Sequence, residues 1–550
     1  MRQTRFPLRV ALAVLLLDCL APRPIRAQPV SVLMQHNDLG RTGSNPNEST
    51  LNTSNVNVSK FGKLFSRAVD GQIYAQPLYV PSVTIAGKTQ NVVYVATMHN
   101  SVYAFDADDP SASAPLWQLN FGTSVPSTCD DTQPEYGILS TPVIDPTTNT
   151  IYVVARTTET NGSILFRLHA LDITKGAEKP GSPVVIQASV PGSGLGSANG
   201  TVAFDASIEI NRPGLLLLAG QVYVAFSSAC DADNFHGWVM AYSAATLAQT
   251  AVFNVTPHGG FGGIWQSGNG PAVDSAGNIY VLAGNGSFDA NQPGGFDYSD
   301  SFLRLSQSLS VLDYFTPSIQ ATMQEDDIDL AAGPVLLPGT TYVVGGSKDG
   351  LIRVVNTTNM GHFNSSGDSQ IVQEFQAAEG PMLASPATWT GPAGQFLYVW
   401  TQNDVLKQYR ISAGKLQTTP FATSSAAGPD GARGGALSVS SNGTTSGTAI
   451  LWAAVAANAD SVPPPGVLRA YDATNVGTEL WNSYQNQGRD DFGLLAKFAA
   501  PTIANGKVYV ATFSNQLVVY GLRSAPQPIL CEPQEVPTLA MPRCRAGSAE

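Results

Sequence analysis

Residues 93–96 read Val-Tyr-Val-Ala, and short apolar stretches of the same kind recur along the chain. They are rich in β-branched and aromatic residues, which favour β-strands. The other copies lie at 151–154, 222–225, 279–282, 342–344, 397–400, 451–454 and 508–511. Their spacing of about 55 to 70 residues is within reach of a four-stranded blade with insertions. The chain is therefore predicted to contain eight β-repeats.

Other elements recur in phase with these strands. A second strand follows each copy, as at 102–106, 168–172, 239–242 and 468–472, and a third element ends at Leu116-Trp117 or Leu480-Trp481. A run rich in Gly, Ala or Pro precedes each copy, as at 75–78 and 140–143. Small residues suit the innermost strands of a ring, because those strands crowd together at its axis. We therefore expect eight blades of four short strands each.

The two ends of the repeat region complement each other. The last copy stops at 517–520 without an outer strand, and an orphan strand at 63–69 precedes the first copy. Closing the ring with that strand removes exposed sheet edges, which would otherwise promote aggregation. The sequence thus predicts an all-β, eight-bladed β-propeller in which an N-terminal strand completes the last blade. A two-sheet sandwich or several small β-domains are the alternative.

Composition excludes two classes of protein. The 550 residues include 29 Lys and Arg against 41 Asp and Glu, a formal net charge of -12. Without a basic excess, the chain is a poor candidate for binding nucleic acid. Charged residues make up 13% and hydrophobic residues 43% of the chain, which argues against intrinsic disorder.

The first residues resemble a secretory signal. Arg2, Arg5 and Arg9 precede an apolar run at 10–21, and 25–27 offers a cleavage site. We therefore predict a signal peptide at 1–27 and a secreted or periplasmic protein. No later stretch is apolar enough to predict a transmembrane segment. The predicted organisation continues with an N-terminal extension at 28–60, the propeller at 61–522 and a Pro-rich tail at 523–550.

The stretch at 470–481, Ala-Tyr-Asp-Ala-Thr-Asn-Val-Gly-Thr-Glu-Leu-Trp, resembles the repeat of the quinoprotein dehydrogenases. Those proteins are eight-bladed propellers that bind pyrroloquinoline quinone (PQQ) with a calcium or lanthanide ion. The resemblance extends from about residue 61 to residue 522. The same repeat also builds non-catalytic propellers, so the resemblance implies the fold more strongly than the activity.

The resemblance also suggests a set of site residues. The stretch 263–265 and the stretch 281–286 look like the family segments that hold the cofactor and the metal. Trp265 would stack on the flat quinone, and Asn285 would offer its amide oxygen to Ca²⁺. In each case the alternative is structural: Trp265 as a core aromatic residue and Asn285 as a turn residue.

Two further positions follow from the same resemblance. The segment 328–333 looks like the family segment that carries the catalytic aspartate, so Asp329 would accept the substrate's hydroxyl proton. Lys348 matches a basic residue placed against the quinone oxygens. Ala331 stands where lanthanide-type members carry a further aspartate, which favours calcium. A solvated acidic loop and a hairpin lysine are the structural alternatives.

The remaining metal ligand and the cysteines fit the family less well. Asp231 and Asp233 occupy the region of the family's metal-binding glutamate, although neither aligns without a shift of one residue. Many family members join two adjacent cysteines near the cofactor, but residues 127–131 contain only Cys129. We predict instead a Cys129–Cys230 disulfide between loops on one face of adjacent blades; two free thiols are the alternative. Cys531 and Cys544 lie close together in the tail and would pair.

These observations lead to a functional hypothesis with alternatives. The protein would be an exported, PQQ-dehydrogenase-like propeller that oxidises a small alcohol or sugar with PQQ and Ca²⁺. Because the chain lacks a C-x-x-C-H haem motif, its electrons would pass to a separate acceptor. The main alternative is a non-catalytic envelope propeller that binds a protein or a glycan. A carbohydrate-active hydrolase or lyase using acidic groups at the axis is a third, supported by no motif.

Overall fold

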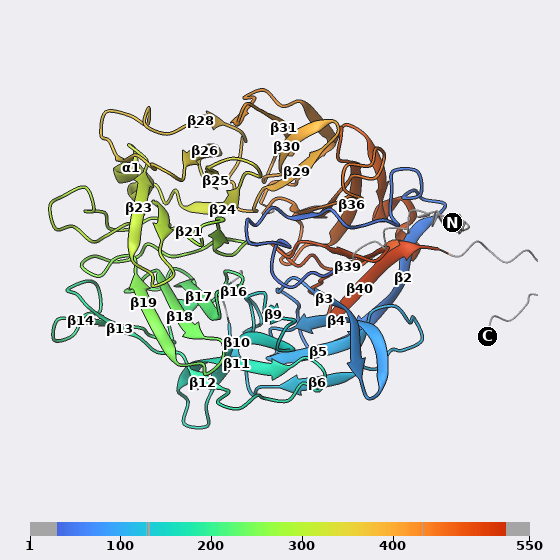
Figure 1. Cartoon of the computed structure of the whole chain (residues 1–550), viewed down its shortest axis with the longest axis horizontal. Coiled ribbons are helices and arrows are strands. Elements are labelled where there is room, and N and C mark those ends of the chain that lie inside the picture. Colours follow the sequence, from blue (N-terminus) through green and yellow to red (C-terminus); the bar gives the residue numbers. More distant parts are fainter. Residues whose placement is uncertain (1–29, 128, 130–131, 432, 524–550) are drawn as a thin grey trace, which may run out of the picture.

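A computed structural model describes residues 30–127, 129, 132–431 and 433–523. Eight sheets of four or five strands are arranged in this part of the chain as a ring around a central axis (Figure 1). The predicted all-β, eight-bladed propeller is therefore confirmed. The predicted signal peptide at 1–27 and the Cys531–Cys544 pair lie outside the described residues. Among the described residues, no helix has the length and apolar character needed to cross a membrane.

In the first four blades the strands follow one another in chain order from the axis outward. Blade 1 contains β3 (Leu78–Ile85), β4 (Lys88–Ala96), β5 (Ser101–Asp106) and β6 (Trp117–Asn120). Blade 2 contains β9 (Val143–Asp145), β10 (Thr150–Thr158), β11 (Ile164–Asp172) and β12 (Val184–Val185). Blade 3 contains β15 (Glu209–Ile210), β16 (Leu216–Leu218), β17 (Gln221–Ser228), β18 (Trp238–Ser243) and β19 (Gln249–Asn254). Blade 4 contains β20 (Ala272–Val273), β21 (Ile279–Leu282), β22 (Phe302–Leu305), β23 (Val311–Thr316) and β27 (His362–Phe363).

The other four blades complete the ring, and the last two include strands from the N-terminal region. Blade 5 contains β24 (Leu330–Leu336), β25 (Tyr342–Ser347), β26 (Leu351–Asn356) and β28 (Gln373–Gln376). Blade 6 contains β29 (Ala387–Gly391), β30 (Gly394–Val399), β31 (Val405–Ser412), β32 (Lys415–Leu416) and β33 (Ala422–Ala427). Blade 7 contains β1 (Ser44–Asn45), β34 (Ala436–Ser440), β35 (Ile450–Ala456), β36 (Gly466–Asp472) and β37 (Glu479–Asn482). Blade 8 contains β38 (Thr502–Ala504), β39 (Lys507–Val510), β40 (Gln516–Leu522) and β2 (Phe61–Ala68).

A few short elements lie outside the blades. Two small hairpins pair β7 (Val125–Pro126) with β8 (Glu135–Tyr136) and β13 (Ser189–Pro191) with β14 (Thr201–Ala203). The helical turns are α1 (Gln320–Glu325), η1 (Ser483–Asn486) and α2 (Gln487–Asp490). These hairpins and helical turns lie in the connections between blade strands, and they do not form a second domain in the described part of the chain.

Ring closure occurs as the sequence predicted. Strand β2 pairs antiparallel with β40 as the outer strand of blade 8, in a register from Phe61 opposite Leu522 to Ala68 opposite Gln516. Phe61 is fully buried, and its ring centroid lies 4.9 Å from that of Trp481 in blade 7. The N-terminal strand is thus fixed both by a backbone ladder and by packing against the neighbouring blade.

The tyrosine of the recurring strand explains why the repeat has its form. In five blades its hydroxyl donates a hydrogen bond to a backbone carbonyl just after the third strand of the next blade. These bonds are Tyr94 to Ile173 (3.1 Å), Tyr152 to Ala244 (2.8 Å), Tyr223 to Gln307 (2.9 Å), Tyr398 to Ala473 (2.5 Å) and Tyr509 to Ala107 (3.1 Å). Each bond pairs a tyrosine hydroxyl with a backbone carbonyl at a buried or partly buried position between two apolar blade faces. The tyrosines therefore link neighbouring blades.

The segment before β2 lies along the axis of the ring, where Figure 1 shows it in blue near the centre. Its backbone carbonyls accept hydrogen bonds from backbone N–H groups on the innermost strands of six blades. In order of blades 1, 2, 4, 5, 6 and 7, the donors are Tyr79, Ile144, Val273, Leu336, Thr388 and Val439. Arg41, which is fully buried, donates to the carbonyl of Leu215 in blade 3, and Asn45 donates to that of Ile503 in blade 8. The segment therefore contacts the inner edge of every blade.

The blade topology defines the two ends of the axis. The innermost strand of a blade runs toward one end, and the second strand returns. The β20–β21 and β24–β25 turns therefore lie at the opposite end from the β21–β22 and β25–β26 connections. Leu336, at the end of β24, bonds to Gly40 of the axial segment. The axial segment consequently lies toward the turn end, and the β21–β22 and β25–β26 connections form the other end.

Candidate functional site

Four of the residues singled out by the sequence come from connections at one end of blades 4 and 5. Trp265 precedes β20, Asn285 follows β21, Asp329 precedes β24, and Lys348 follows β25. All four connections lie at the end of the axis opposite the turns. The blade topology thus brings residues together that are up to 83 positions apart in the sequence.

Asp329 is the centre of this arrangement. Its side chain is almost fully buried, with an exposed fraction of 6%, and its Oδ2 lies 2.6 Å from Nζ of Lys348. Its Oδ1 accepts a hydrogen bond from the backbone N–H of Asn285 at 3.0 Å. Burial raises the pKa of Asp329, while the neighbouring ammonium group of Lys348 opposes that rise. Asp329 is therefore a carboxylate held from two sides, with an increased affinity for a proton.

Lys348 is shared between two aspartates. Its Nζ also lies 2.8 Å from Oδ2 of Asp327, which is itself well exposed. Burial alone would lower the pKa of Lys348, but Asp329 and Asp327 outweigh burial and the pKa is raised. Lys348 is therefore firmly cationic at neutral pH. The Nδ2 of Asn285 donates to Oδ1 of Asp327 at 3.3 Å, which ties Asn285 to the same network.

Trp265 joins the network through a close approach at Gly284. A Cβ atom on Gly284 would lie 2.3 Å from Oδ1 of Asp329 and 2.7 Å from Nε1 of Trp265. Only glycine fits there, so Trp265 and Asp329 sit on either side of the same backbone position. The four residues Trp265, Asn285, Asp329 and Lys348 form one contiguous group, which we call the axial cluster.

The ring of Trp265 is half-buried and has aromatic and cationic neighbours. Phe235 meets it edge-on with a centroid distance of 6.1 Å, and the guanidinium carbon of Arg212 lies 5.5 Å from its centroid. Its Nε1 is buried without a hydrogen-bond partner among the described residues. An unpaired indole N–H in a polar cluster is costly unless a further group satisfies it.

Three residues near the axial cluster were not predicted from the sequence. Asp327 had appeared only as part of a solvated acidic stretch, and Arg212 carried no motif. Asp300 is fully buried; burial first, and then the charge of Asp329, raise its pKa well above the usual range. Its Oδ2 accepts from Nε2 of Gln320 at 3.2 Å. No local sequence pattern marks Asp300; the fold brings it to the axial cluster, where its backbone N–H donates to the carbonyl of Gly284 at 2.8 Å.

Asp231 and Asp233 lie on a different loop. Both side chains are exposed, whereas Asn285 is half-buried. Asp233 lines a separate cavity of about 530 Å³, which also includes Asp205 and Asn234. Their role as metal ligands stays a prediction.

The predicted disulfide is confirmed. Cys129 and Cys230 are bonded, with Cα atoms 5.8 Å apart and a sequence separation of 101. The bond links the connection after blade 1 to the β17–β18 connection of blade 3. It ties down loops at the same end of the ring as the axial cluster.

Comparison with known proteins gives a likeness of fold. No family model matches the chain, and no curated protein matches its sequence. A europium-containing methanol dehydrogenase superposes with a TM-score of 0.55 and 14% identity, over 90% of this chain and 98% of its own. A quinohemoprotein alcohol dehydrogenase from Comamonas testosteroni superposes with a TM-score of 0.55 and 14% identity, over 90% of this chain and 81% of its own. One from Pseudomonas putida HK5 superposes with a TM-score of 0.53 and 14% identity, over 90% of this chain and 82% of its own.

The chain has the fold of the quinoprotein alcohol dehydrogenases. This confirms the expected PQQ-repeat type of eight-bladed propeller. At 14% identity the likeness establishes the quinoprotein fold and no activity, so the chemistry has to be argued from the axial cluster.

The axial cluster has groups that suit a planar quinone and a hard cation. Trp265 offers a flat face and an unsatisfied Nε1–H, and Lys348 offers a fixed positive charge. The amide oxygen of Asn285 and the carboxylates of Asp327 and Asp329 are oxygen ligands of the kind that Ca²⁺ prefers. Within the described chain, no group of three or more His, Cys, Asp or Glu side chains could hold a metal ion. A cation here would thus depend on the Asn285 amide as well as on the two carboxylates.

Proposed function

We propose that the protein is an exported quinoprotein dehydrogenase that oxidises an alcohol or a sugar with PQQ and Ca²⁺ and passes the electrons to a separate acceptor. The observation that carries this proposal is the contact of a buried Asp329 with Lys348, beside Trp265 and Asn285, at one end of the axis. The quinoprotein fold and the predicted signal peptide support it.

The residues of the axial cluster would have distinct roles. The Asp329 carboxylate would accept the hydroxyl proton of the substrate, and its raised pKa makes it a better proton acceptor at neutral pH. The backbone N–H of Asn285 and the Nζ of Lys348 hold that carboxylate in one orientation. Trp265 would bind the cofactor by stacking, while Asn285, Asp327 and Asp329 would hold Ca²⁺. When bound, PQQ would supply the acceptor for the substrate's hydride with its two electrons, and Ca²⁺ would supply a Lewis acid.

Reconstitution with cofactor tests the proposal. The purified protein, incubated with PQQ and Ca²⁺, should reduce an artificial dye when an alcohol is added. Asp329→Asn should lower kcat by about 100-fold or more, because it removes the proton acceptor while keeping the shape of the side chain. Lys415→Gln removes the charge of an exposed lysine on β32 and serves as the control for a single change of charge away from the axial cluster. An Asp329→Asn variant that turns over as fast as the wild type would refute the assigned role of Asp329.

A non-catalytic propeller that binds a protein or a glycan is the second candidate. Two observations favour it: residues 127–131 lack the adjacent cysteine pair of many family enzymes, and Lys348 already forms ion pairs with both Asp327 and Asp329. This candidate predicts that PQQ does not bind and that Asp329→Asn has no catalytic effect. Screening the protein on a glycan array would then be the next measurement.

A further inference from the structure

A second feature lies at the same end of the axis, across the ring from Asp329. It is a cavity of about 560 Å³ formed by the connections of blades 7 and 8 with contributions from blade 1 and from residues 133–134. Arg433 precedes β34, Ser461 follows β35, Lys497 precedes β38, and Phe513 follows β39. These connections correspond, blade by blade, to those that hold the axial cluster. We call this feature the cationic pocket.

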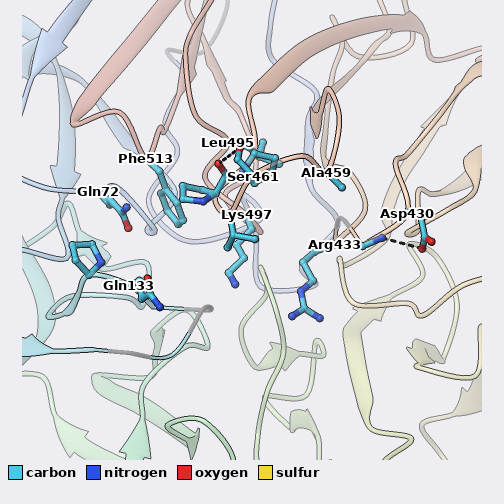
Figure 2. Close-up of a pocket in the computed structure, with 14 residues that line it drawn as sticks. Gln72, Gln133, Asp430, Arg433, Ala459, Ser461, Leu495, Lys497 and Phe513 are labelled. Atoms are coloured by element: carbon cyan, nitrogen blue, oxygen red, sulfur yellow. Dashed lines mark hydrogen bonds between the residues drawn. The ribbon is translucent and has the colours of Figure 1, made fainter.

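The chemistry of the cationic pocket is amphipathic. Figure 2 shows the side chains of Arg433 and Lys497 extending into the same space. Phe513 and Leu495 form an apolar wall and are themselves largely buried. The cationic pocket also includes the carboxylate of Asp430, so its lining carries two cations against one anion, whereas the protein as a whole has a net charge of -12. An arginine and a lysine beside an apolar wall suit a ligand with a carboxylate and a hydrophobic body.

A row of rings joins the cationic pocket to the axial cluster. The guanidinium of Arg212 lies 5.5 Å from the Trp265 ring and 5.6 Å from the ring of Phe498, the neighbour of Lys497. Beyond Phe498, the ring of Tyr74 lies at 6.5 Å, and that of Phe513 lies 5.6 Å further on. A series of contacts between aromatic rings and the Arg212 guanidinium therefore connects the two features.

We propose that the cationic pocket binds an organic carboxylate, with Arg433 and Lys497 as the anion-binding pair and Phe513 with Leu495 as the contact for its apolar part. Each of the two cationic side chains also has an interaction within the protein. An incoming carboxylate would have to replace such a partner, so we expect a small probe to bind with a Kd in the micromolar to millimolar range.

The carboxylate bound in the cationic pocket could belong to either of two molecules. It could belong to the substrate, which would then be an alcohol that also carries an acid group, or to the acid groups of PQQ. Assigning it to either source rests on the proposed function, whereas the existence of the carboxylate site does not.

Calorimetric titration with benzoate, and with benzamide as the uncharged counterpart, tests the site directly. We expect benzoate to bind and benzamide to bind at least about 10-fold more weakly, since a hydrogen bond to a charged group is worth more than a neutral one. Arg433→Gln and Lys497→Gln should each weaken benzoate binding by about 10-fold and leave benzamide binding unchanged. Lys415→Gln, on the outside of blade 6, should behave as the wild type.

The proposal is overturned if benzoate and benzamide bind equally, if neither binds at about 10 mM, or if both variants bind benzoate as tightly as the wild type does. The comparison of the two probes on the wild-type protein stands even if a variant misfolds. Adding PQQ to the benzoate complex then identifies the source of the carboxylate. If PQQ displaces benzoate, the site is assigned to the acid groups of the cofactor. If benzoate stays bound beside PQQ, the site is assigned to the substrate. Benzoate binding without any PQQ retention would sink the proposed function and leave the carboxylate site intact.

Discussion

The hydroxyl groups that join neighbouring blades give a quantitative test of how the ring is held together. Tyr398 in blade 6 is fully buried, and its hydroxyl donates to the carbonyl of Ala473 in blade 7 at 2.5 Å. Tyr398→Phe removes this bond and no carbon atoms, so the apolar packing of the ring is kept. The Ala473 carbonyl retains a second donor, Nε2 of Gln408 at 3.1 Å. We therefore expect a loss of about 1 to 1.5 kcal/mol and not the larger cost of an orphaned carbonyl.

Urea unfolding followed by tryptophan fluorescence measures this loss. The midpoint should fall while the slope with urea stays the same, because the surface exposed on unfolding does not change. Tyr342→Phe is the matched control: Tyr342 begins the equivalent strand of blade 5, but its hydroxyl has no hydrogen-bond partner among the described residues. An unchanged midpoint for Tyr398→Phe, or an equal fall for Tyr342→Phe, would refute the role assigned to these hydroxyls.

Three further predictions concern closure, the axial segment and the disulfide. Phe61→Ala should destabilise the protein by about 3 to 5 kcal/mol, because it leaves a cavity beside Trp481. The loss would appear as a lower midpoint of urea unfolding, and a loss below about 1 kcal/mol would argue against closure of the ring by β2. Burial lowers the pKa of His36 to about 4 in the folded protein, whereas a histidine in the unfolded chain titrates near 6.5. Between these two pH values the unfolded chain binds a proton that the folded protein does not. The free energy of unfolding should therefore fall by up to about 3 kcal/mol as pH drops from about 6.5 to about 4. His36→Asn, which tolerates the positive φ of 55°, should flatten that part of the pH–stability curve; an equally steep curve would contradict the assignment. Cys129→Ser should cost about 2 to 4 kcal/mol, and peptide mapping without reductant should show the Cys129–Cys230 link in the wild type only.

The repeat made the fold predictable. Seven of the eight apolar stretches place a tyrosine or tryptophan at their second position. The last blade lacked an outer strand of its own, which predicted its completion by β2. The Cys129–Cys230 bond could be predicted because the blade order put both loops at one end of the ring. In these cases the information is local and periodic, which is what a single sequence carries.

The axial segment and parts of the site were beyond the sequence. Residues 30–48 have no periodic pattern, and they are held largely by backbone hydrogen bonds to the inner strands, which any residue type can make. Asp300 and Arg212 reach the axial cluster from blades 4 and 3 through tertiary packing alone. The cationic pocket likewise depends on Arg433 and Lys497, which are 64 positions apart and belong to no motif.

Retention of PQQ is the most direct test of the central proposal. Equilibrium dialysis with Ca²⁺ should show about one PQQ bound per chain at micromolar concentration, with quenching of tryptophan fluorescence. Trp265→Leu should weaken retention by about 10-fold or more, because it removes the stacking face. No PQQ retained by the wild type at micromolar concentration, or retention that Trp265→Leu leaves unchanged, would contradict a cofactor site at the axial cluster.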